Sequence, residues 1–411
     1  MRRALIAALC ALSTPLHAQT ATLAITHAQA WTIDKDAPLA DATILITGDR
    51  IAAVGSGIAV PPGIPVIDAH DAPVTPGFYN AQTQLGLVEV SSAPDTRDAA
   101  SKLPGIGASF DIAPALTGNS TLVLLARYDG LTGATAIPTG TAEAPFAGLA
   151  AREKLREGDD ILDAAGAALV LTIGGGANEA TGSRAAQWLA LRSAFDEARD
   201  PPPPVQARLS REDVAVLRRA LARVLPVAIA TNRESDIREA IRLASAFHLK
   251  LILLGAAEAW RLAPQLAAAG ISVVIDPEAN LPTSFDQLGN RQDAAVILTK
   301  AGVRIAFGEV GTAIGQSYDA GLALREAAGA AVRNGLPYAD ALRAVTLTPR
   351  AIYGDSTGGR IAPGAPADLV VWDGDPFEPS TNTAAVIVGG VPASLDNRQL
   401  DLARRYLGAG K

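Results

Sequence analysis

The sequence predicts an α/β protein: a TIM-like (β/α)8 barrel inserted into a composite β-sandwich module that is built from both chain ends. Its central part alternates short apolar runs with stretches of helical periodicity, which is typical of parallel strands joined by right-handed crossovers. Both ends show short strand patterns separated by glycine and proline. The 411 residues suit one large barrel with an accessory domain, and the repetition favours a closed barrel over an open sheet.

The first residues have the layout of a secretory signal peptide. Arg2 and Arg3 precede the apolar run ALIAALCALSTPL, and small residues provide a cleavage site after Ala18. A short membrane anchor is the alternative, although the run is shorter than the ~20 residues that a span needs. We therefore expect residues 1–18 to be removed from a periplasmic or secreted protein. The only cysteine, Cys10, would leave with them, so the mature chain would hold no disulfide and no thiolate metal site.

Two segments are expected to form the composite β module, residues 19–76 and 358–400. In the first segment the strand patterns are TLAITHAQAWTI, ATILITGDRIAAVG and PVIDAHDAPV. After Gly358 the pattern returns in GRIAPGAPADLVVWDGDPFE and NTAAVIVGGVPA. Because these runs are short, alternate in polarity and are separated by turn residues, they predict strands rather than helices.

Residues 77–357 are expected to form the barrel. The apolar runs that predict its later strands are ALVLTI, PVAIAT, LKLILLG, ISVVID and VRIAFG. Stretches of helical periodicity lie between them, among them SRAAQWLALRSAFDEARD and ESDIREAIRLASAF. The proline run at 201–205 cannot be helical and marks a rigid connector.

Composition narrows the function classes. Hydrophobic residues make up 49% of the chain and aromatic residues only 4%, so the core must consist mainly of Ala, Val, Leu and Ile. The formal net charge is -7 and no basic block stands out, which argues against a nucleic-acid partner.

Four stretches carry a resemblance to one known family. They are GDRIAAVG at 48–55, VIDAHDAPVTPGFYNAQTQLGL, PVAIATNRESDI followed by LKLILLGAAEAW, and GRIAPGAPADLVVWDGDP. Through them the chain resembles the amidohydrolase superfamily, most closely its imidazolonepropionase-like and prolidase-like branch. The resemblance covers nearly the whole mature chain. It implies a (β/α)8 barrel with a composite β module, and metal-dependent hydrolysis of amide or similar C–N bonds.

The resemblance also implies a zinc ion held by histidines and carboxylates at the C-terminal ends of barrel strands. The positions that match the first-strand His-x-His pair are Gln82 and Gln84, and the fifth- and sixth-strand positions match Ala230 and Gly255. A glutamine amide is a poor zinc ligand, and the other two side chains offer none. The eighth-strand carboxylate, the proton shuttle of the family, falls at or near Glu309. The chain is therefore predicted to be a degenerate member with no metal and no other cofactor.

The histidines of this chain do not replace the missing ligands. His17 belongs to the signal peptide, and no histidine is expected at the C-terminal end of a barrel strand. We expect structural roles for His27 in the first strand, His70 in a turn and His248 at the end of a helix.

Several polar residues are expected at the barrel mouth. Gln82, Gln84, Asn232 and Arg233 could form a hydrogen-bonding pocket for a carboxylate or sugar-like ligand. Alternatively, the two glutamines fill the barrel centre and bond to each other, and Asn232 caps the following helix.

The carboxylates of Asp276, Glu278 and Glu309 offer a further possibility. They could bind Ca2+ or Mg2+, or act as an acid–base pair.

Three functions stay open at this level. The chain is a hydrolase of C–N bonds made weak or inactive by loss of its metal centre, and so a pseudoenzyme. Alternatively, it is a non-catalytic periplasmic protein that binds a small polar ligand, or the inactive partner of an active homologue in a homo- or hetero-oligomer. The third function is an altered enzyme that uses Glu309 and neighbouring carboxylates.

Overall fold

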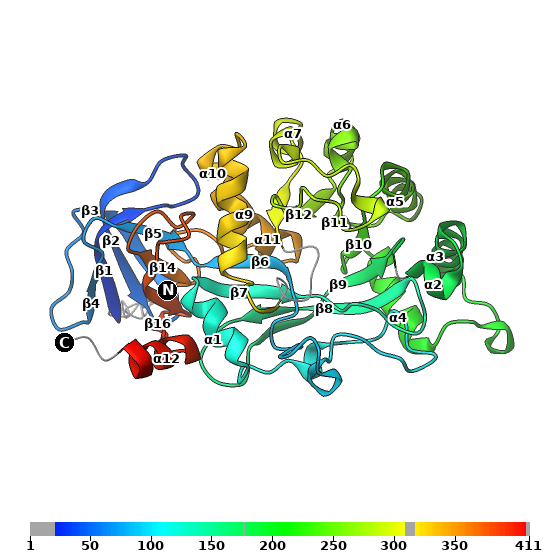
Figure 1. The fold of residues 1–411 in the computed structure, drawn as a ribbon, viewed down its shortest axis with the longest axis horizontal. Coiled ribbons are helices and arrows are strands. Elements are labelled where there is room, and N and C mark those ends of the chain that lie inside the picture. Colours follow the sequence, from blue (N-terminus) through cyan, green and yellow to red (C-terminus); the bar gives the residue numbers. More distant parts are fainter. Residues whose placement is uncertain (1–20, 176, 309–316, 408–411) are drawn as a thin grey trace, which may run out of the picture.

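The computed structural model describes residues 21–175, 177–308 and 317–407. Two sheets of eight strands each lie side by side, a small sheet and a larger curved sheet that is lined by helices (Figure 1). The predicted architecture, a barrel with a module built from both chain ends, is confirmed. The signal peptide and Glu309 lie outside the described residues. Among the helices described, none is both long and apolar enough to span a membrane.

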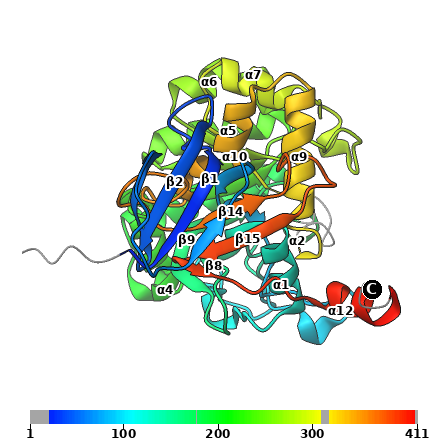
Figure 2. The same cartoon turned by 90° about the vertical axis from the view of Figure 1, so that its left-hand side faces the viewer.

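The small sheet has the strand order β16-β15-β14-β5-β1-β2-β3, and β4 pairs with β1. The strands are β1 (Leu23–Ala30), β2 (Leu39–Thr47), β3 (Arg50–Ser56), β4 (Val66–Asp68), β5 (Pro73–Pro76), β14 (Leu369–Trp372), β15 (Thr383–Val388) and β16 (Val391–Pro392). Figure 2 shows the N-terminal strands, in blue, beside the C-terminal strands, in orange to red. The antiparallel pair β5–β14 joins the two chain ends, as the sequence predicts.

The larger sheet has the order β13-β12-β11-β10-β9-β8-β7-β6 and forms a nearly closed barrel. Its strands are β6 (Phe78–Thr83), β7 (Leu131–Ala136), β8 (Phe146–Lys154), β9 (Leu162–Thr172), β10 (Val227–Thr231), β11 (Leu251–Gly255), β12 (Ser272–Ile275) and β13 (Ile305–Phe307). Strand β8 runs antiparallel to both neighbours, so the expectation of an all-parallel barrel is wrong there. The connections 137–145 and 155–161 are shorter than the dozen or so residues that a parallel crossover needs.

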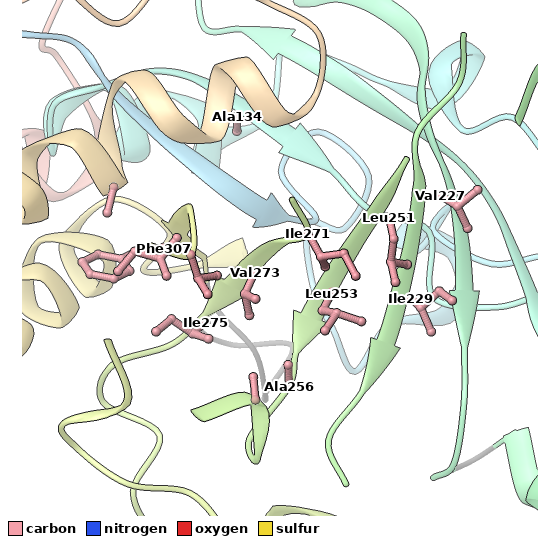
Figure 3. Close-up of a cluster of buried hydrophobic side chains, with 14 of the residues drawn as sticks. Ala134, Val227, Ile229, Leu251, Leu253, Ala256, Ile271, Val273, Ile275 and Phe307 are labelled. Carbon is pink, nitrogen blue, oxygen red and sulfur yellow. The ribbon is translucent and has the colours of Figure 1, made fainter. Parts of the chain in front are cut away.

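Side chains along the barrel strands alternate between two cores. In β10, Val227 and Ile229 point outward into the core under the helices, while Ala228 points into the barrel. Figure 3 shows the outward set on β10 to β13, including Leu253 and Val273. The barrel interior holds many alanines, which suits the narrow space enclosed by eight strands.

Helices cover the outer face of the barrel. The α-helices are α1 (Thr121–Tyr128), α2 (Ala177–Thr181), α3 (Arg184–Arg199), α4 (Arg211–Leu221), α5 (Glu234–Phe247), α6 (Ala263–Ala268), α7 (Ala294–Lys300), α9 (Leu322–Arg333), α10 (Tyr338–Val345), α11 (Leu347–Ile352) and α12 (Arg398–Leu407). The sequence missed α12, which follows the last strand. The proline run was expected to be non-helical, but its end forms a 3-10 turn at Pro204–Gln206. Such a short turn tolerates proline because it needs few backbone N–H donors.

One carboxyl group is buried in strand β8 without a partner. Glu153 is 1% exposed, and neither of its oxygens accepts a hydrogen bond from the residues described. Burial raises the pKa of Glu153 well above its usual value. The folded protein therefore favours the protonated acid, and ionisation of Glu153 opposes folding.

We expect Glu153→Leu to increase the free energy of unfolding at pH 8 by roughly 1–3 kcal/mol, the usual cost of an unsatisfied buried polar group. The folded pKa lies above the unfolded value of 4.5, so the unfolded chain releases this proton first as the pH rises. The stability of the wild type should thus fall relative to the variant as the pH rises above 4.5. Urea unfolding of both proteins at pH 4, 6 and 8 measures the difference. A constant or reversed difference would contradict the account.

Candidate functional site at the barrel mouth

A small cavity of about 140 Å³ lies at the C-terminal ends of the barrel strands. It is enclosed by the ends of β6, β9, β10 and β11 and by the long segment 276–293 that follows β12. The lining residues are Gln82, Thr172, Ile173, Gly174, Gly175, Ala230, Thr231, Asn232, Leu254, Ser284 and Asp286. The structure therefore brings three of the predicted mouth residues together, Gln82, Ala230 and Asn232.

Gln82 is held in place by its neighbours on three sides. Its backbone N–H donates to Oδ1 of Asn80 over 3.0 Å, and a register shift interrupts the pairing of β6 with β7 between Asn80 and Thr83. Gly308 packs so closely that a Cβ there would lie 2.9 Å from the backbone nitrogen of Gln82. Glycine at 308 thus lets the end of β13 approach β6 at this point.

The Gln82 side chain, which lines the cavity, carries a hydrogen-bond acceptor without a partner among the described residues. Gln82 is only 8% exposed, and its Oε1 has no hydrogen-bond partner among the described residues. Thr231, at the end of β10, also lines the cavity, and its buried Oγ1 likewise has no partner among the described residues. Beside them Ala230, Leu254 and Ile173 provide apolar walls. A buried acceptor left unpaired costs free energy that a ligand N–H or O–H would recover.

Asn232 does not cap helix α5, so that expectation is wrong. Its Oδ1 accepts a hydrogen bond from the backbone N–H of Ala257 over 3.3 Å. Arg233 occupies the N-cap position without a capping side-chain bond. The first turn is satisfied instead by Glu258, whose Oε2 accepts from the Glu234 N–H over 2.7 Å. Asn232 thereby ties the loop after β10 to the loop after β11.

A charged clamp holds segment 276–293 over the mouth. Asp286 pairs with Arg233 Nε over 2.7 Å and with Nη2 of Arg184. Arg184 also pairs through Nε with the buried Asp236 over 2.8 Å. Gly174 has a positive φ of 84°, and a Cβ there would lie 2.6 Å from Arg184 Nη2, so glycine makes room for the clamp.

The remaining predicted site residues that the structure describes do not line the cavity. Gln84 is buried just beyond β6, and Gly255 ends β11 with a positive φ of 79°. Neither residue lines the cavity. Asp276 and Glu278 follow β12 and do not line it either. Asp276 Oδ1 accepts from the Glu278 N–H over 2.9 Å, which is a turn contact. Glu309 lies outside the described residues.

Among the described residues, the positions that match the family's zinc ligands do not fit zinc. Ala230 has no donor atom, and Gln82 offers a neutral amide oxygen, whereas zinc prefers imidazole, thiolate and carboxylate. Nowhere in the described parts of the chain do three or more His, Cys, Asp or Glu residues cluster to hold a metal ion. Two described histidines belong to the small sheet, where His27 Nδ1 bonds to Asp68 over 3.0 Å. His248 ends α5.

Sequence reasoning missed Thr231, Ser284 and Asp286. Thr231 directly follows Ala230, so the strand end itself could have indicated it. Ser284 and Asp286 lie well beyond β12, in a loop without periodicity. The only available signal was that the loop begins at the C-terminal end of a barrel strand.

The fold and the site define an α/β-barrel protein with a cavity at the C-terminal ends of the strands, the end at which barrels of this kind carry their active sites. The chain belongs to the amidohydrolase family, hydrolases that act on C–N bonds, because the model of that family matches residues 115–393. The resemblance seen in the sequence is thus confirmed at the level of the family. A sequence comparison with curated proteins gave no match.

Solved structures share the fold at low sequence identity. An amidohydrolase from Thermotoga maritima MSB8 is 22% identical, with a TM-score of 0.78 over 90% of this chain and 99% of that chain. A prolidase complexed with N-methylphosphonate-L-proline is 16% identical, with a TM-score of 0.56 over 90% and 99%. An adenosine deaminase from Xanthomonas campestris with bound zinc is 18% identical, with a TM-score of 0.56 over 94% and 97%.

The clamp predicts how segment 276–293 responds to mutation. We expect Asp286→Ala to lower the free energy of unfolding by roughly 1–3 kcal/mol, because two partly exposed guanidinium groups lose their carboxylate. Amide hydrogen exchange of residues 277–290 should become faster.

Asp293→Ala is the matched control. Asp293 lies at the end of the same segment, and among the described residues its carboxylate pairs only with Arg291, at an exposed position. Its loss should change stability by at most about 1 kcal/mol and leave exchange in 277–290 unchanged. Equal effects of the two variants would refute the role of Asp286.

Proposed function

We propose that this member of the family binds a small amide-bearing ligand at its barrel mouth, and that it hydrolyses C–N bonds weakly or not at all. One observation carries the proposal. Gln82 lines the mouth cavity, and its Oε1 is a buried acceptor with no partner among the described residues. A ligand N–H placed there would recover the hydrogen bond.

The size and walls of the cavity support an amide head group rather than a whole substrate. About 140 Å³ is close to the volume of a cavity that holds one benzene molecule. An amide group offers N–H donors to Gln82 Oε1 and a carbonyl acceptor to the hydroxyl of Thr231. Its short apolar substituent fits beside Ala230 and Leu254.

The proposal of weak or absent hydrolysis rests on the same residues. Hydrolysis in this family requires a metal ion that activates water and polarises the carbonyl. By the resemblance in sequence, Gln82 and Ala230 match positions where the family has metal ligands, and neither suits zinc. Neutral hydrogen bonds position an amide but do not generate hydroxide at neutral pH. We also propose export to the periplasm or beyond, which rests on the signal-peptide pattern of residues 1–18.

Matched probe ligands test the role of Gln82. Propionamide should raise the melting temperature of the mature protein, whereas N,N-dimethylpropionamide, which has no N–H, should not. Gln82→Leu should weaken the binding of propionamide by about three- to tenfold, the value of one hydrogen bond. The variant should not be less stable than the wild type, because it removes an unpaired acceptor.

The exposed residue Gln206 provides the control. Gln206→Leu should bind propionamide as the wild type does. Equal binding by Gln82→Leu would contradict the placement of the ligand. Steady turnover of propionamide by the wild type, followed as ammonia release, would contradict the proposed loss of hydrolysis.

Restoring the family ligands tests the alignment itself. The triple variant Gln82→His, Gln84→His, Ala230→His should bind zinc, and zinc at a hundred times its Kd should then add about 2.7 kcal/mol to the stability. Mass spectrometry of the purified proteins, dialysed without chelator, should find stoichiometric zinc in the variant and little in the wild type. Stoichiometric zinc in the wild type would overturn the emptied-site proposal. A variant without zinc would show that these positions do not converge.

A further inference from the structure

A second and larger cavity lies at the opposite end of the barrel. Its volume is about 750 Å³, and it is enclosed by the starts of the strands from β9 to β13 and by the segments that follow α4, α5 and α11. Ligand cavities of several hundred Å³ are typical of small-molecule sites. The mouth residues Gln82 and Asp286 do not line it.

The charge of this cavity has one sign. Its basic lining residues are Arg152, Arg223, His248, Lys250 and Arg304, and no aspartate or glutamate lines it. The chain as a whole carries a net charge of -7, so the cavity is a basic region of an acidic protein. Cationic side chains that gather around a concave surface attract anions, and the low-dielectric wall strengthens the attraction.

Contacts within the described chain leave some of these basic side chains without a carboxylate partner. Arg152 is compensated, because it pairs with Asp163 over 2.8 Å. Arg223 Nη1 and Arg304 Nη2 each donate to a backbone carbonyl, of His248 over 2.7 Å and of Gly270 over 3.3 Å. A guanidinium has five N–H donors, so these bonds leave donors free.

Lys250 is a basic residue of the cavity without a polar side-chain partner in the described chain. Its ammonium makes no ion pair and no side-chain hydrogen bond with the residues described in this structure. Lys250 and Arg304 immediately precede strands β11 and β13, so rigid barrel strands present both side chains.

Apolar residues complete the wall. Val224, Ile241, Leu249, Ile271 and Ile352 line the cavity, and Tyr353 closes it toward the barrel interior. The Tyr353 hydroxyl is buried and has no hydrogen-bond partner in the described chain. A ligand that matches both parts of the wall has an anionic head and an apolar body.

From this geometry we infer a second ligand site at the base of the barrel, which binds a small molecule with an oxyanion head and an apolar body. Lys250, Arg304 and Arg223 bind the phosphate- or carboxylate-type head, and the aliphatic wall packs against the body. The site is independent of the amide site proposed at the mouth, because the two cavities share no lining residue.

Phenyl phosphate is the probe, with phenol and inorganic phosphate as its two halves. Calorimetric titration of the mature protein in 150 mM salt should find one saturable site for phenyl phosphate, with weaker binding of either half. Lys250→Glu with Arg304→Glu should weaken this binding by about a hundredfold, because two charge-assisted contacts become repulsive. Melting curves verify that the double variant is folded.

Two control variants make the outcome decisive. Lys102→Glu with Lys300→Glu changes exposed lysines elsewhere and should leave the affinity unchanged. Gln82→Leu should also bind phenyl phosphate normally, so failure of the mouth proposal does not affect this test. Absence of saturable binding, equal affinity for phenol, or no effect of Lys250→Glu with Arg304→Glu would overturn the inference. Loss of binding in Gln82→Leu would place the anion at the mouth and overturn it as well.

Discussion

A buried carboxylate, Asp368, fixes the small sheet against the barrel. It is 5% exposed, and its Oδ1 lies 3.1 Å from Nζ of Lys154 in β8 and accepts from the Gly389 N–H over 2.7 Å. Its backbone carbonyl accepts from the N–H of Gly77, where the chain crosses from the small sheet into the barrel. A carboxylate this deep is tolerated only when it is paired and hydrogen-bonded. No strand pairs across the two sheets in the described chain, so contacts such as this joint help to hold the barrel on which both cavities lie.

The barrel could be predicted because each of these strands and helices has a pattern that is visible in its own short run of sequence. The run ESDIREAIRLASAF corresponds residue for residue to α5, and PVAIAT contains β10. The reversal of β8 was not visible, because the side-chain period of a strand is the same in parallel and antiparallel sheets. Helix α12 was missed because the strand pattern before it gave no reason to expect another helix. The direction of a strand and the presence of a helix after the last strand depend on connection length and tertiary packing, which hydrophobic periodicity does not encode.

The mouth was only partly predictable, for a related reason. Gln82 and Ala230 could be placed because strand ends on one edge of a barrel converge. Asn232 also lies at the mouth as predicted, whereas the alternative that it caps helix α5 is wrong, because its side-chain oxygen accepts from the N–H of Ala257 in a neighbouring loop. Asp286 could not be placed at all, since its position depends on how a long loop folds back onto Arg184 and Arg233.

The charges around the two cavities imply opposite selectivities. At the mouth, the carboxylates of Asp236 and Asp286 compensate the guanidinium groups of Arg184 and Arg233, so a small cavity with neutral oxygens remains. A charged ligand would lose its hydration there without finding a free counter-ion, which favours a neutral ligand. At the base, Lys250 has no carboxylate partner among the described residues and no acid lines the cavity, so an anion is favoured. Under the two proposals, the neutral ligand and the anion would therefore not compete for one cavity.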